Sequence, residues 1–267
     1  MLVRVTILAL LPLTACQHKL IYFPRSYEPD VVAAFTAKTG KRITYRTGQG
    51  QQQAWYVPAT EGPAEKLWIV CGGNGSLALE FQPVVEAAGF KHDAWILVDY
   101  PGYGECQGAP NPARIRESLA AVVPLAARES GIPMTALPAQ AIVFGHSLGC
   151  AAGLLAVEEF HLKRAVLCAP FTSTMEMTRA MLGVPLGWIV YHRFNNRDGL
   201  ASLRASGGRA WLTHGDADPV IPVSMSRTLA DEFKDIVQYR EIPRGGHNDL
   251  FERDGQSIFA AMNQARH

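Results

Sequence analysis

The protein has 267 residues, of which 48% are hydrophobic and 18% are charged, and this is enough apolar material for one substantial core. A formal net charge of +1 argues against a nucleic-acid-binding surface and against a polybasic arm for membranes. No apolar run after the N-terminus is long enough to span a bilayer. Composition therefore predicts one folded domain that binds no nucleic acid.

The N-terminus is typical of a bacterial signal peptide. Arg4 gives the first residues a positive charge, and the apolar run that follows, residues 5–13, is too short to span a membrane. The next residues complete the sequence Leu-Thr-Ala-Cys, which ends at Cys16 and resembles a lipobox. An ordinary signal peptide with an incidental cysteine is the alternative. We expect residues 1–15 to be removed and Cys16 to be lipidated.

Lipidation would anchor the remaining domain, residues 16–267, at the bacterial cell envelope without a transmembrane helix. Gln17 rather than aspartate follows the cysteine. By resemblance to enterobacterial lipoproteins, this favours the outer membrane, with the protein facing the periplasm. The membrane is therefore an expected partner of the chain, whereas the sequence leaves the oligomeric state open.

The other cysteines do not form a metal-binding pattern. Three of the four lie in apolar stretches, which is typical of buried small hydrophobic residues, and no C-x-x-C spacing occurs among Cys71, Cys106, Cys150 and Cys168. A core of this size does not need disulfide bonds even where the compartment permits them. We expect no disulfide and no zinc site.

Short strand-like runs alternate with helix-like runs along the chain, which indicates βαβ units. Strands are expected at residues 42–47, 51–57, 66–71, 93–99, 139–145, 164–169, 209–214 and 237–242, and helices at 77–88, 114–130, 148–159, 224–234 and 250–264. The first two strands are joined by a hairpin-like turn. Continuous apolar runs are typical of buried parallel strands. The pattern predicts an α/β fold with a mostly parallel central sheet of about eight strands flanked by helices.

Residues 171–200 interrupt this alternation. The segment has no strand signal and is unusually apolar. It lies between two strands, where a small cap over a ligand site could be inserted, because such sites lie beyond the carboxyl ends of parallel strands. A core helix with a loop is the alternative. We expect a cap in which Met175, Trp188, Ile189 and Val190 face a cleft above the site.

A nucleophile-elbow motif, G-x-S-x-G, occupies residues 145–149, with Ser147 at its centre. The serine of this motif sits on a strained turn, where side chains at the two glycine positions would collide with neighbouring backbone. An apolar strand precedes the motif and a helix-compatible segment follows it, which is the context that the motif requires. Ser147 is therefore the candidate nucleophile.

A serine hydroxyl needs a base, usually a histidine that a carboxylate orients. Two later segments supply these groups directly after predicted strands: residues 214–222, with Asp216 and Asp218, and residues 245–249, with His247. The order serine, acid, histidine matches that of strand–turn–helix serine hydrolases. His247 is the candidate base, and either aspartate could orient it. The chemistry needs no metal and no organic cofactor.

Four segments together resemble the α/β-hydrolase family, in particular its small serine hydrolases related to the serine aminopeptidase and depalmitoylase-like groups. They are the Gly-Gly-Asn turn at 72–74, the run Asp-Tyr-Pro-Gly-Tyr-Gly-Glu-Cys-Gln-Gly at 99–108, the elbow, and the two polar loops that follow it. The resemblance implies an α/β-hydrolase fold and selects Asp218 as the acid. It also implies an oxyanion hole made of the backbone N–H groups of Leu148 and Asn74.

The chain departs from the family pattern at two positions. Gly72 stands where the family has histidine, and Cys106 stands where it has serine. Neither position supplies the nucleophile, the base or the acid. The first departure lies next to the expected oxyanion hole and puts the geometry of that loop in question.

Three functions fit the sequence. The first is a serine hydrolase that cleaves a carboxylic ester or thioester through an acyl-enzyme intermediate; the apolar segment and the anchor favour a small-molecule or lipid-like acyl substrate. The second is a peptidase or amidase that uses the same triad. The third is a non-catalytic binding lipoprotein, against which the complete triad argues.

Overall fold

The computed structural model describes residues 21–38, 40–182 and 191–267. Within these residues one mixed sheet contains eight strands: β1 (Lys41–Thr47), β2 (Gly50–Val57), β3 (Lys66–Cys71), β4 (Asp93–Val98), β5 (Ala141–His146), β6 (Arg164–Cys168), β7 (Arg209–Gly215) and β8 (Val237–Ile242). Their order across the sheet is β1-β2-β4-β3-β5-β6-β7-β8. β2 is antiparallel to both of its neighbours, and all the other adjacent strands are parallel.

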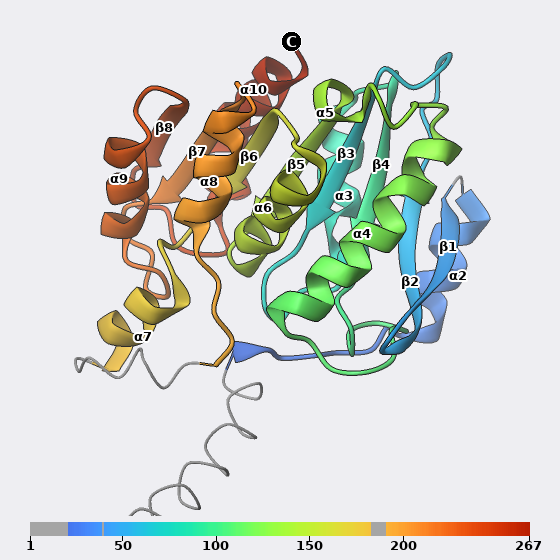
Figure 1. The fold of residues 1–267 in the computed structure, drawn as a ribbon, viewed down its shortest axis with the longest axis horizontal. Coiled ribbons are helices and arrows are strands. Elements are labelled where there is room, and N and C mark those ends of the chain that lie inside the picture. Colours follow the sequence, from blue (N-terminus) through green and yellow to red (C-terminus); the bar gives the residue numbers. More distant parts are fainter. Residues whose placement is uncertain (1–20, 39, 183–190) are drawn as a thin grey trace, which may run out of the picture.

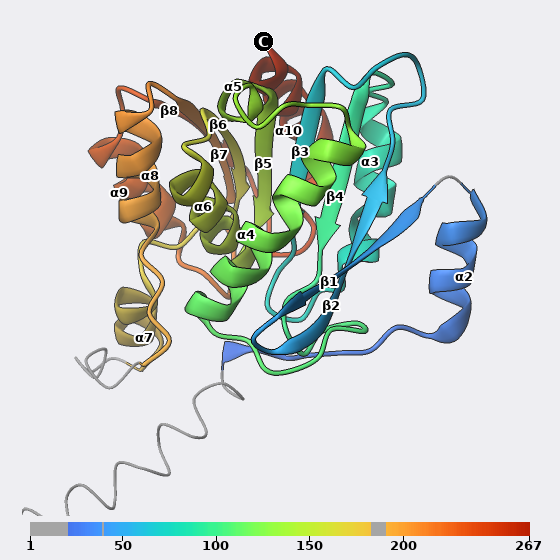
Figure 2. The same ribbon diagram turned by 45° about the vertical axis from the view of Figure 1, so that its right-hand side comes forward.

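Helices cover both faces of this sheet (Figures 1 and 2). One face carries α4 (Pro112–Glu129), α6 (Leu148–Phe160), α8 (Asn196–Ala205) and α9 (Val223–Glu232). The other face carries α2 (Pro29–Lys38), the 3-10 helix η1 (Ala78–Phe81), α3 (Gln82–Ala88) and α10 (Leu250–Arg266). Two short helices lie outside these layers, α5 (Leu137–Gln140) and α7 (Thr174–Leu182).

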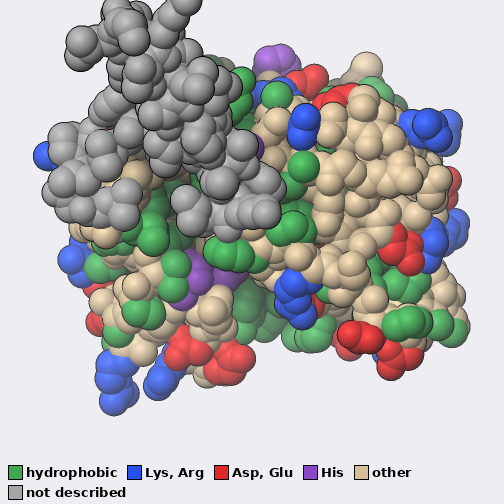
Figure 3. Space-filling view, turned by 90° about the horizontal axis from the view of Figure 1, so that it is seen from below, with side chains coloured by type: hydrophobic (Ala, Val, Ile, Leu, Met, Phe, Trp, Pro, Cys, Tyr) green, Lys and Arg blue, Asp and Glu red, His purple; other side chains and the backbone are tan. Residues whose placement is uncertain are grey.

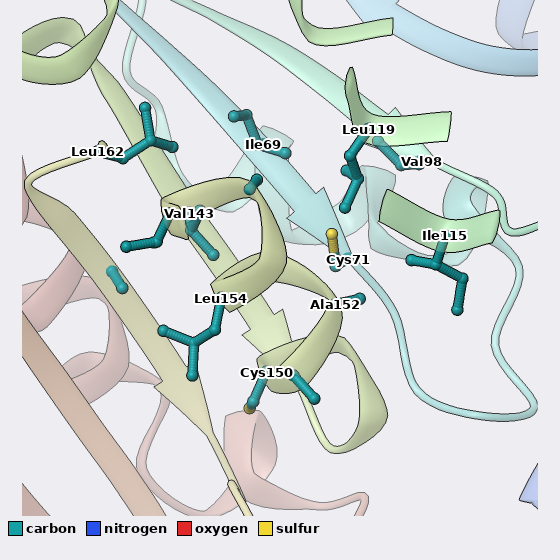
Figure 4. Close-up of a cluster of buried hydrophobic side chains, with 14 of the residues drawn as sticks. Ile69, Cys71, Val98, Ile115, Leu119, Val143, Cys150, Ala152, Leu154 and Leu162 are labelled. Atoms are coloured by element: carbon teal, nitrogen blue, oxygen red, sulfur yellow. The ribbon is translucent and has the colours of Figure 1, made fainter. Parts of the chain in front are cut away.

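The central strands are buried because helices exclude water from both of their faces. β4 is buried along its whole length, and β3 and β5 are buried at five of their six positions. Figure 4 shows the core on the α4 and α6 side, where Ile69 and Val143 of the sheet meet Leu119 and Leu154 of the helices. The continuous apolar runs of the sequence therefore become strands buried on both faces.

The predicted eight-stranded, mostly parallel sheet flanked by helices is confirmed. Two local predictions were wrong. The single helix expected at 77–88 is η1 followed by α3, with Pro83 in the first turn of the second helix. Residues 139–140, expected to begin a strand, lie in α5, where Pro138 favours a helical turn. Helices α2, α7 and α8 were not among the expected helices.

Helix α8 begins inside the segment that was expected to form a cap. Leu200 and Leu203 are fully buried in the core that α8 shares with α6, and a side chain at Gly199 would collide with Leu154 of α6. The last residues of the expected cap are therefore part of the helical layer. Among the described helices, none combines the length and hydrophobicity that crossing a membrane requires.

The parallel strands all end at one edge of the sheet, the lower edge in Figure 1, which we call the carboxyl edge. The loops after β3, β5, β7 and β8 meet there, and the first described residues, 21–28, run across it before α2. Because the candidate nucleophile, acid and base follow β5, β7 and β8, the topology alone brings the three loops together.

Candidate active site

Ser147 occupies a strained turn between β5 and α6. Its backbone has φ 57° and ψ −121°, a conformation that L-residues rarely adopt. A hydrogen bond ties the turn to the end of β6: the Ser147 N–H donates to the Cys168 carbonyl at 2.9 Å. Such strain persists only where the surrounding structure enforces it, and it lifts the serine hydroxyl above the end of the sheet.

The two glycines of the elbow are required by close backbone contacts. A Cβ at Gly145 would lie 2.6 Å from the carbonyl oxygen of Gly149. A Cβ at Gly149 would overlap the carbonyl group of Cys71 at the end of β3. The G-x-S-x-G pattern therefore reflects the tight passage of the turn over β3 and α6.

His247 joins the nucleophile to the acid. Its Nε2 lies 2.9 Å from the Ser147 hydroxyl oxygen, and its Nδ1 lies 2.7 Å from Oδ2 of Asp218. All three side chains are almost completely shielded from solvent. A hydrogen on Nδ1, facing the carboxylate, leaves the Nε2 lone pair free to accept the serine proton.

Asp218 receives four N–H groups. Oδ1 accepts from the backbone of Val220 and Ile221 at 2.7 and 2.9 Å. Oδ2 faces Nδ1 of His247 and Nε2 of His214, which lies 3.1 Å away. Burial by itself raises the pKa of the Asp218 carboxyl, but the hydrogen bonds from His214, His247 and Ile221 outweigh it and hold that pKa well below its usual range.

Asp216, the alternative acid, makes different contacts. Its Oδ1 accepts from the backbone N–H of Arg244 at 2.5 Å, and its side chain is exposed. The carboxylate within hydrogen-bonding distance of His247 is that of Asp218, so the geometry favours the residue that the family pattern selected.

A further histidine, whose position the sequence reasoning did not single out, supports this arrangement. Nε2 of His146 lies 2.9 Å from the carbonyl oxygen of His247, and the two rings are 5.1 Å apart. Burial lowers the pKa of His146 to about 4, so the ring is neutral at pH 7. His146 therefore ties the elbow to the backbone of the candidate base. Its only signal in the sequence is its place next to Ser147.

The loop after β3 lies directly beside the nucleophile. A Cβ added at Gly73 would be 3.6 Å from the Ser147 Cβ and 3.5 Å from Nδ1 of His146. Leu148 is the first residue of α6, and the N–H groups of a first helical turn have no partner within the helix. The Asn74 side chain points elsewhere, because its amide donates to the Ile21 carbonyl at 3.1 Å. The backbone N–H groups of this loop are therefore the candidates for the oxyanion role.

The structure explains both departures from the family pattern. A Cβ at Gly72 would lie 2.8 Å from the ring of Phe81, which fills the space that a side chain would need. The Cys106 thiol accepts from the Gln53 N–H on β2 and donates to the Gln53 carbonyl, each at 3.3 Å. Cys106 therefore performs a structural role that a serine hydroxyl could also fill.

Several predicted residues cannot be placed. Cys16, Trp188, Ile189 and Val190 lie outside the described residues. Met175 is on α7, half-exposed, and lines a surface hollow of about 480 Å³ with residues of α4, α6 and α8. Ser147 does not line that hollow, so no described contact links Met175 to the nucleophile.

The described residues contain no group of three or more histidine, cysteine or acidic side chains arranged to hold a metal ion. Their four cysteines, at positions 71, 106, 150 and 168, are buried free thiols. Burial raises the pKa of the Cys71 and Cys168 thiols to about 12. None of these thiols is therefore a candidate nucleophile.

Comparison with known proteins agrees with the fold. The model of the alpha/beta hydrolase family matches residues 69–231, more than half of the chain. An uncharacterized protein of Mycobacterium tuberculosis is 27% identical over 251 residues, which is 93% of this chain and 86% of the relative. The uncharacterized protein YfhR of Escherichia coli is 26% identical over 243 residues, 86% of this chain and 80% of the relative.

Solved structures with the same fold have little sequence in common with this chain. An esterase of Pyrococcus furiosus superposes with a TM-score of 0.70 at 13% identity, covering 91% of this chain and 96% of the esterase. The esterase Est1E of Butyrivibrio proteoclasticus, bound to ferulic acid, has a TM-score of 0.65 at 16% identity, covering 84% of this chain and 98% of Est1E. At this identity the likeness establishes the fold alone.

Proposed function

The chain belongs to the alpha/beta hydrolase family, and from this premise we propose that it is a serine hydrolase that cleaves a carboxylic ester or thioester. The observation that carries the proposal is the relay Ser147–His247–Asp218, with successive distances of 2.9 and 2.7 Å. A purely binding protein has no need of a strained serine aligned with a buried histidine and carboxylate.

The reaction would proceed in two halves. His247 takes the proton of Ser147 as the serine oxygen attacks the substrate carbonyl, and Asp218 stabilises the imidazolium. The N–H groups of Leu148 and Asn74 would bind the oxyanion, and each such donor typically contributes about 3 kcal/mol to transition-state stabilisation. His247 then protonates the leaving alcohol or thiol, which leaves an acyl group on Ser147. Water, deprotonated by His247, hydrolyses this acyl-enzyme.

A fluorophosphonate probe tests the nucleophile. The wild-type protein should become labelled at Ser147, whereas Ser147→Ala should remain unlabelled with an unchanged circular dichroism spectrum. Ser202→Ala, on α8, is a matched control that should label like the wild type. Equal labelling of wild type and Ser147→Ala would refute the proposal.

The leaving group is tested separately. A peptidase or amidase would use the same relay, and the solved esterases with this fold favour an ester substrate. Parallel assays with p-nitrophenyl esters, an acyl thioester and an aminoacyl anilide should show turnover of the esters or thioester and little turnover of the anilide. Faster turnover of the anilide would assign the protein to the peptidases instead.

We further propose that Cys16 is lipidated and holds the protein at the cell envelope, most favourably at the periplasmic face of the outer membrane. The support is the lipobox-like sequence at residues 13–16. Growth with radioactive palmitate should label the protein, and Cys16→Ser should abolish the label. A mature N-terminus at another residue, without lipid, would refute this localisation.

A further inference from the structure

The first described residues form a strap that is fixed to the carboxyl edge of the sheet. The Ile21 carbonyl accepts from the Asn74 amide at 3.1 Å, and the Phe23 N–H donates to the Asn74 carbonyl at 2.9 Å. Further along, the Arg25 carbonyl accepts from the Gly104 N–H at 2.8 Å. Tyr22 is buried, with its ring 5.5 Å from that of His192. These contacts hold the strap in place beside the candidate oxyanion loop.

The strap begins five residues after Cys16. Five residues span at most about 18 Å even when fully extended. A folded chain of this length has a radius of gyration of about 18 Å and is therefore more than about 40 Å across. A lipid on Cys16 would thus keep Ile21, and the edge to which it is bonded, close to the bilayer, while the opposite end of the sheet could not reach it.

Exposed apolar side chains gather at the same edge. Of the seven large hydrophobic residues that are exposed in the described chain, five belong to it, and we call them the apolar rim: Phe23, Met175, Met181, Tyr191 and Val220. Met181 and Tyr191 are the most exposed of all, at 70% and 74%. The two remaining residues, Val31 and Met134, lie on α2 and before α5.

Contacts to site and strap residues place three members of the rim. Phe23 is bonded to Asn74, and the Val220 N–H is bonded to Asp218. Tyr191 directly precedes His192, whose ring lies 5.5 Å from that of Tyr22 in the strap. Figures 1 and 2 both draw α7, which carries the two methionines, at this edge beside the start of the strap. Figure 3 looks onto the edge and shows hydrophobic side chains next to histidine on the part that is not grey.

We propose that the apolar rim rests on the lipid bilayer, so that the candidate active site opens toward the membrane and receives acyl substrates that reside in it. The proposal rests on the proposed hydrolase function and the proposed anchor. Exposed apolar side chains gain free energy on entering the headgroup region, so the rim adds to the binding that the lipid on Cys16 would supply. Because the net charge is only +1, we expect no strong dependence of binding on anionic lipids.

Depth-dependent fluorescence quenching tests whether the apolar rim faces the bilayer. Single cysteines are introduced as Phe23→Cys at the rim and Met134→Cys at the opposite end, where α5 leads into the start of β5. The four native thiols of the described chain are buried, so the new cysteine can be labelled selectively with an NBD fluorophore. The lipidated protein is reconstituted in phosphatidylcholine vesicles with and without doxyl-labelled lipid.

The emission maximum of the label at position 23 should shift to shorter wavelength on vesicles, and doxyl lipid should quench at least half of its fluorescence. The emission of the label at position 134 should change little. Equal quenching at the two positions, or none at position 23, would overturn the proposal. This measurement does not involve catalysis, so its outcome is independent of the proposed hydrolase function.

Activity provides the second measurement. The double variant Met181→Asp/Tyr191→Asp should hydrolyse a long-chain ester embedded in the vesicles at least tenfold more slowly than the wild type. It should retain the wild-type rate on soluble p-nitrophenyl acetate. Met134→Asp is the matched control and should leave both rates unchanged. Equal loss on both substrates, or none on the embedded ester, would contradict a membrane-facing rim. Absence of wild-type activity on every ester would instead refute the hydrolase function.

Discussion

Nε2 of His214 lies 3.1 Å from Oδ2 of Asp218, the same oxygen that Nδ1 of His247 contacts at 2.7 Å. His214 is completely buried at the end of β7, and its Nε2 also faces the Ile221 carbonyl at 3.1 Å. Because both neighbours are acceptors, Nε2 carries a hydrogen. On the other side of the ring, Nδ1 lies 2.6 Å from the hydroxyl of Ser226. His214 thus holds the carboxylate that orients the candidate base.

Replacing His214 should therefore impair catalysis without impairing substrate binding. His214→Phe removes a hydrogen bond to a charged group, worth about 1.5–3 kcal/mol, so kcat should fall by about 10- to 100-fold. KM should stay close to the wild-type value, because His214 does not contact Ser147. Steady-state kinetics on a soluble ester measure both constants.

Two variants separate positioning from stability. His214→Gln keeps an N–H donor and should recover most of the lost kcat. His92→Gln, on a half-exposed histidine paired with Glu61 at the opposite end of the sheet, should leave kcat unchanged. A rise in KM with constant kcat in His214→Phe would speak against a positioning role.

The acid assignment can be tested with a matched pair of aspartates. Asp218→Asn should lower kcat by at least about 10³-fold, because the amide no longer holds His247 in the reactive tautomer. Asp216→Asn, two residues away, should have little effect, since its carboxylate bonds to the Arg244 backbone. Esterase assays at fixed pH decide the matter, and a larger loss at position 216 would transfer the role to Asp216.

Substitutions of two glycines should have different outcomes, because only Gly149 lies in the crowded elbow. Gly149→Ala should abolish soluble folded protein, because the new methyl group would overlap the Cys71 carbonyl. Gly255→Ala, in α10, meets only ordinary contacts with Phe251 and Phe259. Because Gly255 directly follows the non-helical Asp254 at the kink of α10, this substitution should change the unfolding free energy by less than about 0.5 kcal/mol. Soluble yield and urea unfolding measure these effects, and a well-folded Gly149→Ala protein would contradict the close approach.

Arg266 should anchor the C-terminal helix to the sheet. Its guanidinium makes two bonds to the buried Asp93, at 2.7 and 2.9 Å, and Trp68 donates to the same carboxylate at 2.8 Å. Arg266→Ala leaves that charge without its cation, and the unfolding free energy should fall by about 3 kcal/mol. The exposed pair of Arg253 with Asp249 is the control, and Arg253→Ala should cost less than about 1 kcal/mol. Equal losses of unfolding free energy in the two variants would contradict a special role for the buried Arg266–Asp93 pair.

Asp99 should make stability depend on pH. Burial raises the pKa of its carboxyl to about 6, despite hydrogen bonds from Tyr27, Ala78 and Trp55. Between the unfolded pKa of 3.8 and about 6, the folded state therefore binds more protons than the unfolded state. The unfolding free energy should thus fall as the pH rises through this window, by up to about 3 kcal/mol in total.

Urea unfolding of the wild type and of Asp99→Asn at several pH values between 4 and 7 measures this contribution of Asp99 to the unfolding free energy. The asparagine cannot titrate, so the difference in stability between the two proteins should change across the window in the stated direction. A difference that stays constant from pH 4 to pH 7 would show that Asp99 does not titrate there.

The sheet and the candidate catalytic residues could be predicted from the amino-acid pattern alone. Continuous apolar runs predicted the buried central strands, and shorter mixed runs predicted the outer ones, so all eight strands were expected in order. The motif around Ser147 carried its own structural requirement, because only glycine fits the close contacts that Gly145 makes with Gly149 and Cys150 in the same turn. Those features are local, so local sequence patterns disclose them.

Which of these side chains come into contact depends on the folded chain. Asp216 and Asp218 are two residues apart, and the folded loop alone aims Asp218 at His247 and Asp216 at the backbone of Arg244. The contact between the strap and Asn74 joins residues about 50 positions apart, and no pattern in either segment signals it. Helix α8 escaped prediction for a related reason: its burial depends on α6, far away in the chain. Such contacts are set by packing across the whole fold, which a single sequence does not display.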